Sequence, residues 1–167
     1  MEKKILVAFA TKSGSTREIA EFITKTLQDK GVKAELQEMK SIKSVLEYDA
    51  FILGAPMYMF HILADFHTFI KKNKKTLMEK KAAFFSLGPL NDAEKDWKDV
   101  NEIFHKEMAK YPWFTPVATE VFGGKFDPTT LQFPYNLIPA MKNMPPSDLR
   151  DWEKIKAWTE SLPDLFN

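Results

Sequence analysis

The sequence predicts an α/β fold, a doubly wound, five-stranded parallel sheet with helices on both faces. The first observation is that short apolar runs of strand length alternate with longer segments whose apolar residues recur at helical spacing. The second is that this alternation continues along the chain without an internal repeat or a linker, which is typical of a parallel sheet built from βαβ units. The third is length, because 167 residues suit one domain with a sizeable core. We therefore expect a single domain over residues 1–167.

Simple patterns predict the first two strands and the first helix. Residues 5–10 are continuously apolar, as a strand covered on both faces should be. Apolar side chains over residues 19–27 recur at helical spacing, and Gly31 ends this helix. Residues 32–36 alternate between apolar and polar side chains, which predicts a half-exposed strand at a sheet edge. We expect one short helix within residues 41–48.

The middle of the chain repeats the alternation of strands and helices. Residues 50–54 and 82–87 are apolar runs, and each predicts a buried strand. Between them, the apolar side chains at residues 66–70 indicate a helix that runs on to a lysine-rich stretch. After the second run, apolar side chains spaced over residues 97–108 mark a long helix.

The last part of the chain adds one strand, one irregular segment and one helix. Residues 117–122 predict the fifth strand, and apolar side chains over residues 149–162 predict a C-terminal helix. Between them, a segment at about residues 125–147 holds five of the ten prolines and does not fit the alternation. We interpret this segment as an insertion. Long irregular connections in compact domains tend to be functional or mobile.

Composition and charge exclude several classes of function. The 24 basic and 23 acidic residues give a formal net charge of +1, so no global field favours nucleic acid. No cysteine is present, which excludes disulfides, thiolate catalysis, iron–sulfur clusters and cysteine-ligated zinc. The helical histidines lack partners at metal-ligand spacing, so we expect no metal site. The N-terminal apolar run is too short for a signal sequence or a membrane span, and we expect a cytoplasmic protein with no integral membrane segment.

The segment between the first strand and the first helix is rich in hydroxyl groups and has no carboxylate. It consists of Thr11, Lys12, Ser13, Gly14, Ser15 and Thr16. In doubly wound sheets, ligands gather at the carboxyl ends of strands, where this segment lies. Successive backbone amides and the positive end of a helix suit a phosphate group, and Gly14 permits a close backbone approach. The alternative is a plain turn in which Ser15 or Thr16 is the N-cap of the helix.

This segment fits some phosphate-binding classes poorly and one class well. The chain has neither GxxxxGK(S/T) nor GxGxxG, so a P-loop and a dinucleotide fingerprint are both absent. Residues 11–16 instead match (S/T)-x-(S/T)-G-x-(S/T) and resemble the phosphate loop of the flavodoxin family. The resemblance implies a flavodoxin-like fold with strand order 2-1-3-4-5. It also implies that flavin mononucleotide (FMN) binds with its phosphate on this loop and its ring between two further loops.

The second loop that the resemblance implies follows the third strand. Its bulky side chains and the proline before them are Pro56, Met57, Tyr58, Met59 and Phe60. Four large apolar side chains in a row cannot all point inward, and an exposed apolar cluster usually marks a binding surface. We expect Phe60 to cap the core, and the other four residues to flank the flat ring of the flavin. His61 is interpreted as a surface histidine or, alternatively, as a group within reach of the flavin.

The third loop follows the fourth strand and contains Leu87, Gly88, Pro89 and Leu90. In the flavodoxin family the matching loop offers backbone amides to the pyrimidine edge of the flavin. Gly88 and Leu90 can supply such amides, whereas Pro89 has none. The alternative is an ordinary turn, and we expect Asn91 or Asp92 to cap the next helix in either case.

The end of the chain narrows the resemblance. Gly123-Gly124-Lys125, an inserted segment and Arg150-Asp151-Trp152 are similar to the flavodoxin-domain branch that includes menaquinone-dependent protoporphyrinogen oxidase. Enzymes of that branch pass electrons from a flat macrocycle to a quinone. The insertion carries a loose apolar stripe of Leu131, Phe133, Leu137, Ile138 and Met141. We interpret the stripe as a lid, a docking patch for a planar substrate or a peripheral membrane contact, or alternatively as a satellite core beneath the last helix.

The sequence leaves three hypotheses about function open. The first is an FMN-dependent oxidoreductase or electron carrier whose partner is a redox protein, a quinone or a planar small molecule. The second is a two-electron FMN dehydrogenase linked to protoporphyrinogen or quinone. Many flavodoxins use a glycine in the second loop for one-electron chemistry, and none lies between Gly54 and Gly88. The third is a flavodoxin-fold binding module without a cofactor. No residue is assigned a catalytic role.

Overall fold

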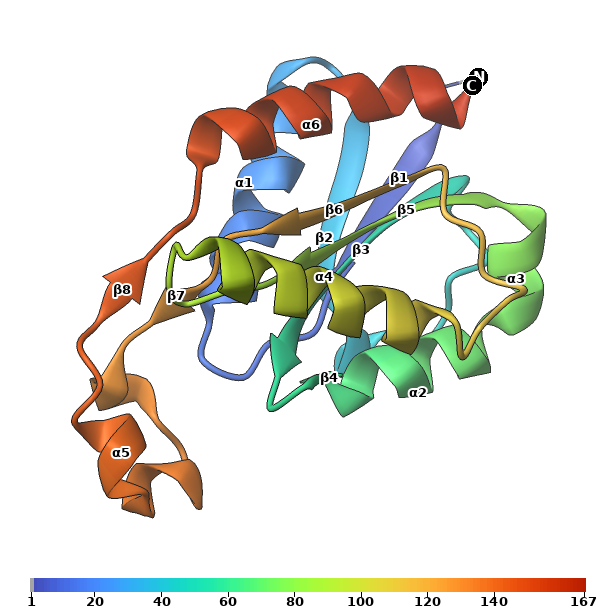
Figure 1. The fold of residues 1–167 in the computed structure, drawn as a ribbon. Coiled ribbons are helices and arrows are strands. Elements are labelled where there is room, and N and C mark those ends of the chain that lie inside the picture. The colour runs from blue at the N-terminus through green and yellow to red at the C-terminus, as the bar shows by residue number, and fades with distance from the viewer. Residues whose placement is uncertain (1) are drawn as a thin grey trace.

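The computed structural model describes residues 2–167 as a sheet of five parallel strands with helices on both faces (Figure 1). The parallel strands are β1 (Lys4–Phe9), β2 (Lys33–Glu38), β3 (Ala50–Tyr58), β5 (Lys81–Leu87) and β6 (Ala118–Phe122). Their spatial order is β2-β1-β3-β5-β6, and the short strand β4 (His61–Ile62) pairs antiparallel with the end of β3. Counting only the parallel strands, the order is 2-1-3-4-5, so the predicted fold class is confirmed.

Two helical layers cover the two faces of the sheet (Figure 1). The longer helices are α1 (Ser15–Asp29), α2 (Ala64–Lys72), α4 (Glu94–Met108) and α6 (Trp152–Phe166), and α3 (Lys74–Glu79) is shorter. Alternate residues of β1 face opposite layers. Ile5 and Val7 pack in the cluster that contains the apolar faces of α1 and α6, whereas Leu6 and Ala8 pack in the cluster with α2 and α4. Because both faces are covered, β1 needs the unbroken apolar run that the sequence has.

The expected helix within residues 41–48 is not present. A single turn of 3₁₀ helix, η1 (Met39–Ser41), is followed by irregular backbone. Ile42, Val45 and Tyr48 are buried as separate anchors of this irregular segment. The Tyr48 hydroxyl donates to Glu35 at 2.6 Å and accepts from Gln37 at 2.7 Å. The segment expected to be a helix is therefore irregular backbone that three separate buried side chains hold in place.

The third strand is longer than the sequence predicted. Pro56, Met57 and Tyr58 were expected in a loop, but they form the last part of β3. Pro56 pairs with Leu87 of β5, and β4 supplies the partners of the other two. Met57 pairs with Ile62, and the Pro56 carbonyl accepts a hydrogen bond from the Leu63 amide at 3.1 Å. Pro56 is tolerated because the pairing uses its carbonyl and needs no amide from it. The second predicted loop is therefore a β-hairpin.

The start of α4 also differs from the expectation. The helix begins at Glu94 with Ala93 as its N-cap and has no side-chain cap, so neither Asn91 nor Asp92 caps it. The Asp92 carboxylate accepts instead from the indole nitrogen of Trp97 at 2.8 Å. This bond ties the third predicted loop to the first turn of α4.

The segment predicted as an insertion leaves and rejoins the domain through a two-stranded ribbon, β7 (Lys125–Phe126) and β8 (Ser147–Asp148). Between them lie η2 (Pro128–Thr130), η3 (Tyr135–Leu137) and α5 (Pro139–Lys142). The segment extends away from α6 (Figure 1), and Phe133 and Leu137 are 75% and 67% exposed. The alternative interpretation of its apolar stripe as a satellite core beneath the last helix is therefore wrong.

Candidate functional site

A hydrogen bond within the loop between β1 and α1 holds the loop, and no side chain of the loop caps the helix. Gly14 is the N-cap residue with a φ of 96°, and α1 has no side-chain cap hydrogen bond. The Thr11 hydroxyl accepts from the Gly14 amide at 2.9 Å and so closes the loop. Ser15 and Thr16 are the first helical residues and not caps, so the alternative interpretation of a capped turn is wrong. The amides of the first helical turn have no intrahelical partner, because a helix always leaves its first donors free.

Thr16 has a buried hydroxyl group without a partner. The residue is fully buried, and among residues 2–167 its Oγ1 finds no hydrogen-bond partner. Buried polar groups are nearly always paired, because an unpaired one loses its hydration without compensation. An orphaned hydroxyl beside an uncapped helix N-terminus is an arrangement that suits an anionic ligand.

A pocket of about 150 Å³ lies at the carboxyl ends of the strands, and we call it the rim pocket. It brings together ten of the fourteen predicted cofactor-binding residues, from all three predicted loops. They are Lys12, Ser13, Ser15, Pro56, Met57, Tyr58, Met59, Leu87, Gly88 and Leu90. Ligands of doubly wound sheets gather at this edge, so the three loops converge where the topology requires.

The remaining four predicted residues do not line the rim pocket. Thr11 and Gly14 build the loop, and Thr16 is fully buried in the first turn of α1. Pro89 lines a neighbouring groove instead, and its carbonyl accepts from the Gly124 amide at 3.0 Å. The Gly88 amide, expected to face a ligand, instead donates to the Phe122 carbonyl at 2.8 Å. Of the two amides expected in this loop, only that of Leu90 is left for the predicted role.

The insertion contributes a wall of the rim pocket that the sequence did not reveal. The additional lining residues are Gly124, Lys125, Phe126, Asp127, Thr130, Leu131, Gln132 and Met141. Gly124 is required here, because a Cβ at this position would lie 2.8 Å from the Gly88 carbonyl oxygen. The Gln132 side chain donates to the Lys12 carbonyl at 3.3 Å. The Gly-Gly-Lys motif and the proline-rich segment were recognisable signals, but they did not place these residues in the site.

Two tyrosines and a lysine join the insertion to the hairpin. The rings of Tyr58 and Tyr135 meet edge to face, with centroids 5.1 Å apart. Lys12 Nζ lies 4.9 Å from each of these centroids, within the range of a cation–π contact. Burial, and then the neighbouring Tyr135, raise the pKa of Tyr58 above its usual value, so its phenol is neutral near pH 7. The rim pocket therefore has an uncharged aromatic wall with a cation beside it.

A smaller side pocket of about 100 Å³ continues the rim pocket over the first turn of α1. It is lined by Ser13, Ser15, Glu18, Lys125, Asp127 and Thr130. Glu18 is neutralised by an ion pair with Arg150 and lies 3.9 Å from Lys125. Hydrogen bonds from Thr129 hold the pKa of Asp127 below its usual range. Charges of both signs thus surround the hydroxyl-rich end of the site.

The tip of the β3–β4 hairpin has an unusual backbone. Met59 and Phe60 have φ angles of 50° and 70°, a region that favours glycine and asparagine. Positive φ at both central residues matches a type I′ turn, which normally carries Asn-Gly. Met59 is 49% and Phe60 is 74% exposed, so Phe60 does not cap the core as expected. Strained, exposed apolar residues beside a pocket are a feature of binding sites.

On the outer side of this hairpin lies a groove of about 320 Å³. It shares Met57, Met59, Gly88 and Leu90 with the rim pocket, so these residues separate the two cavities. The outer wall comes from α4 and carries the carboxylates of Asp96 and Asp99. A molecule in the groove would lie one layer of side chains away from a molecule in the rim pocket.

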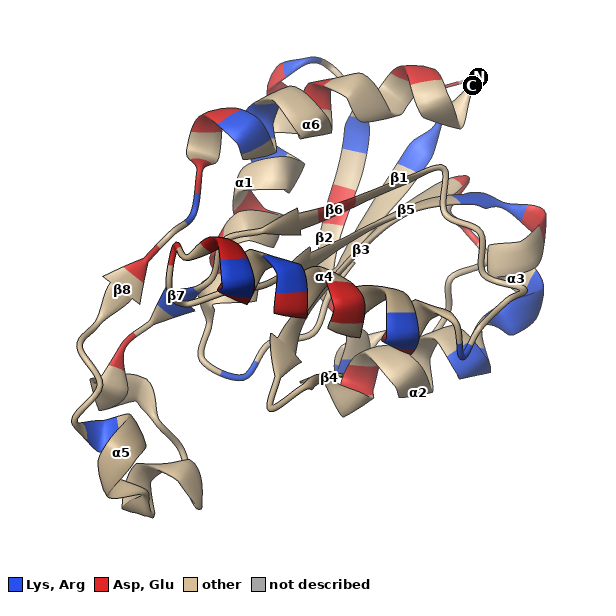
Figure 2. Cartoon of the chain, viewed as in Figure 1, with Lys and Arg blue, Asp and Glu red and all other residues tan. Residues whose placement is uncertain are grey.

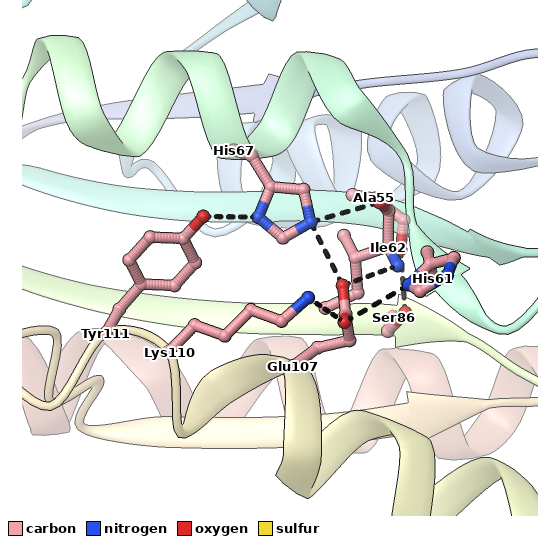
Figure 3. A network of polar contacts seen from close by, with 8 residues as sticks. All are labelled: Ala55, His61, Ile62, His67, Ser86, Glu107, Lys110 and Tyr111. Atoms are coloured by element: carbon pink, nitrogen blue, oxygen red, sulfur yellow. Dashed lines mark hydrogen bonds and ion pairs between the residues drawn. The ribbon is translucent and has the colours of Figure 1, made fainter.

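A buried polar network anchors the hairpin from behind (Figure 3). His67 has no carboxylate partner at metal-ligand spacing in the sequence, but in the fold its Nε2 lies 3.0 Å from the Glu107 carboxylate. His61 is on β4 and its Nδ1 lies 3.4 Å from the same carboxylate. The network was missed because its members are distant in the chain and no local spacing marks them.

The described residues contain neither a cluster of metal ligands nor a helix that could span a membrane. Within residues 2–167, no three His, Asp or Glu side chains gather as a metal ion would need. None of the helices in that range has both the length and the apolar character needed to cross a membrane.

Comparison with known proteins places these features in context. The family model described as flavodoxin domain matches residues 6–141. Protoporphyrinogen IX dehydrogenase (quinone) of Escherichia coli strain K12 is 28% identical over 113 residues, which span 66% of this chain and 62% of that protein. The chain thus matches less than two thirds of the length of this relative.

Solved flavodoxin structures share the fold. Oxidised flavodoxin 2 from Bacillus cereus is 22% identical with a TM-score of 0.63, and the match covers 98% of this chain and 99% of that one. A flavoprotein in complex with FMN from Lactobacillus acidophilus is 16% identical with a TM-score of 0.53, and covers 71% of this chain and 93% of that one.

Proposed function

Because the chain belongs to the flavodoxin domain family, we propose that it binds FMN and acts as an oxidoreductase or electron carrier. The observation that carries the proposal is the unpartnered, buried hydroxyl of Thr16 at the uncapped N-terminus of α1. A phosphate group would pair this hydroxyl and the free amides of the first helical turn together. The residues therefore fit the cofactor, and a binding module without a cofactor would leave them without a role.

Each part of the site has a distinct task in this proposal. Ser13, Ser15 and Thr16 would hold the phosphate with hydroxyl and amide donors. Tyr58 and Leu90 would pack against the ring and exclude water from it. Bound FMN would supply the transfer of electrons, and the protein would bind, orient and tune it.

A second candidate function is a two-electron dehydrogenase acting on a planar substrate such as protoporphyrinogen or a quinone. The groove behind Met57 and Met59 favours it, because a second molecule there would approach the ring through a thin apolar layer. The similarity to protoporphyrinogen IX dehydrogenase (quinone) agrees with this candidate. Reduction of the bound flavin by protoporphyrinogen, or its reoxidation by a menaquinone analogue, would support the dehydrogenase, and no reaction with either would contradict it.

An FMN titration of the purified protein tests the proposal. We expect saturable binding that quenches flavin fluorescence. Ser13→Asp should weaken it at least about tenfold, because a carboxylate would stand where the phosphate binds. Ser161→Asp adds the same charge to the exposed face of α6 and should leave FMN binding unchanged. A protein that ignores FMN, or a Ser13→Asp variant that binds it normally, would overturn the proposal.

A further inference from the structure

Glu107 is a buried carboxylate that the proposed redox chemistry does not use. It lies in the last turn of α4, its side chain is 3% exposed, and Figure 3 shows it at the centre of the network. It accepts hydrogen bonds from the Ile62 amide at 3.1 Å, from His67 Nε2 at 3.0 Å and from Lys110 Nζ, and His61 Nδ1 lies 3.4 Å away. Such a carboxylate is costly to bury unless it is fully paired, and here it is.

His67 pairs with the backbone carbonyl of Ile62, the residue whose amide donates to Glu107. His67 Nε2 lies near two acceptors, the Glu107 carboxylate and the Ile62 carbonyl at 3.1 Å, so this nitrogen carries the hydrogen. His67 Nδ1 then accepts from the Tyr111 hydroxyl at 2.5 Å. Ile62 therefore donates its amide to Glu107 and receives a hydrogen bond on its carbonyl from His67.

The register of the hairpin explains why Ile62 needs these partners. The bond from the Leu63 amide to the Pro56 carbonyl defines one hydrogen-bonded pair, so the next pair, Met57 and Ile62, is not hydrogen-bonded to each other. The amide and carbonyl of Ile62 therefore point away from β3 and towards α4. Because Ile62 is buried, its amide requires an acceptor from the protein, and Glu107 supplies it.

The hairpin itself has few other means of holding its position. Its return strand consists of two residues, and its tip places Met59 and Phe60 in an unfavourable backbone region. Its outgoing strand carries Met57 and Tyr58, which line the rim pocket. Fixing Ile62 therefore fixes its partner Met57 and with it one wall of that pocket.

We propose that Glu107 is a positioning residue of the flavin site, which holds the β3–β4 hairpin against the cofactor through the amide of Ile62. The inference rests on the proposed function, because the hairpin matters to a cofactor only if FMN binds in the rim pocket. The role belongs to the reach of the carboxylate oxygen and not to its charge, since Lys110 forms an ion pair with the carboxylate.

Two substitutions of Glu107 separate the effect of side-chain length from the effect of charge. Glu107→Gln keeps the side-chain length and one acceptor oxygen for Ile62 but removes the charge. Glu107→Asp keeps the charge but shortens the side chain by one methylene, so the carboxylate lies farther from the Ile62 amide. We expect E107D to raise the FMN dissociation constant about tenfold and E107Q to change it less than about threefold. Glu102→Asp on the exposed face of α4 controls for the shorter side chain in a helix and should bind FMN normally.

Hydrogen exchange of the Ile62 amide, measured without FMN, separates this inference from the proposed function. We expect slow exchange in the wild type and in E107Q, and exchange at least about tenfold faster in E107D. If the wild type does not bind FMN, the proposed function fails. The exchange data still report whether Glu107 holds the Ile62 amide. If E107Q loses FMN affinity as E107D does, or both bind like the wild type, the inference is overturned. Because E107Q keeps the buried bond, a loss of FMN affinity in E107Q would overturn the inference even if E107D does not fold.

Discussion

The hydroxyl of Thr16 is a single group that we expect to help binding of the cofactor and to lower the stability of the cofactor-free protein. An unpaired buried polar group costs about 1–3 kcal/mol, and the fold retains this one. We predict that Thr16→Val, which keeps the shape but removes the hydroxyl, stabilises the cofactor-free protein by about 1 kcal/mol. The same change should weaken FMN binding about tenfold. Chemical denaturation and a fluorescence titration measure the two effects.

Thr24 in the same helix provides the matched control. Its hydroxyl is also buried, but it donates to the Ala20 carbonyl at 2.8 Å. Thr24→Val should therefore cost up to about 1 kcal/mol of stability and leave FMN binding unchanged. Equal effects of the two substitutions on stability would contradict the interpretation of Thr16 as an unpaired donor.

The sequence alone identified functional residues where the residues that act together are neighbours in the chain. Residues 11–16 could be recognised because their hydroxyls and glycine are contiguous and follow an apolar strand. Glu107 and His67 could not, because 40 positions separate them and neither helix carries a spacing that marks the contact. The Gly88 amide illustrates the same limit, since its partner Phe122 belongs to another strand.

The β3–β4 hairpin is the element that carries the most backbone strain. Bulky residues with positive φ cost about 1–2 kcal/mol each, and Met59 and Phe60 both have it. We predict that Phe60→Gly stabilises the protein by roughly 1 kcal/mol, because glycine adopts this backbone freely and the exposed Phe60 ring buries little apolar area. FMN affinity should change less than about twofold, because Phe60 lines the outer groove and not the rim pocket.

A matched substitution at another exposed apolar residue tests whether strain is the cause. Leu46 is as exposed as Phe60 but does not have a positive φ. Leu46→Gly should therefore destabilise the protein by about 0.5–1 kcal/mol through the added freedom of the unfolded chain. Thermal unfolding that moves in the same direction for both variants would contradict the strain argument.

Periodicity predicted which elements exist better than where they end. Helix α1 and strand β1 follow their patterns closely, since the pattern and the burial have the same origin. The end of β3 depends on β4, a partner that lies outside the apolar run and has only two residues. The segment around Val45 was expected to be helical but is irregular, and three separate buried side chains, Ile42, Val45 and Tyr48, hold it in place.

At the scale of the whole molecule, an ion-pair network joins the base of the insertion to helix α1. The Arg150 guanidinium bonds to Asp148 through Nε at 2.9 Å and Nη2 at 2.8 Å, and it also pairs with Glu18 on α1. The base is therefore fixed beside the loop over residues 11–16. Beyond the base, Lys142 is the only charged residue over 128–147, and this segment is almost entirely tan in Figure 2. The insertion thus combines an ionic base with an apolar, exposed tip.

Stability in acid is a property of the whole molecule, because every titrating group contributes to it. Burial raises the pKa of Glu107, but hydrogen bonds from Lys110, Ile62 and His61 outweigh burial and lower it from 4.5 to about 2. The unfolded chain therefore takes up this proton first, so the stabilisation is complete above pH 4.5 and is lost as the pH falls towards 2. Burial lowers the pKa of His67 despite Glu107 beside it, which acts in the same direction below pH 6.5.

Comparison of wild type with Glu107→Gln isolates the carboxylate from the other acidic groups, because those groups titrate alike in both proteins. We predict that the free energy of unfolding of the wild type falls more steeply between pH 4.5 and pH 3, and that the full contribution of Glu107 is on the order of 3 kcal/mol. Glutamine has no proton to take up, so the curve of the variant should be flatter over the same interval. Urea unfolding at fixed pH values measures both curves. Parallel curves would mean that Glu107 titrates alike in the folded and unfolded chain, which would contradict the lowered pKa of its carboxyl group.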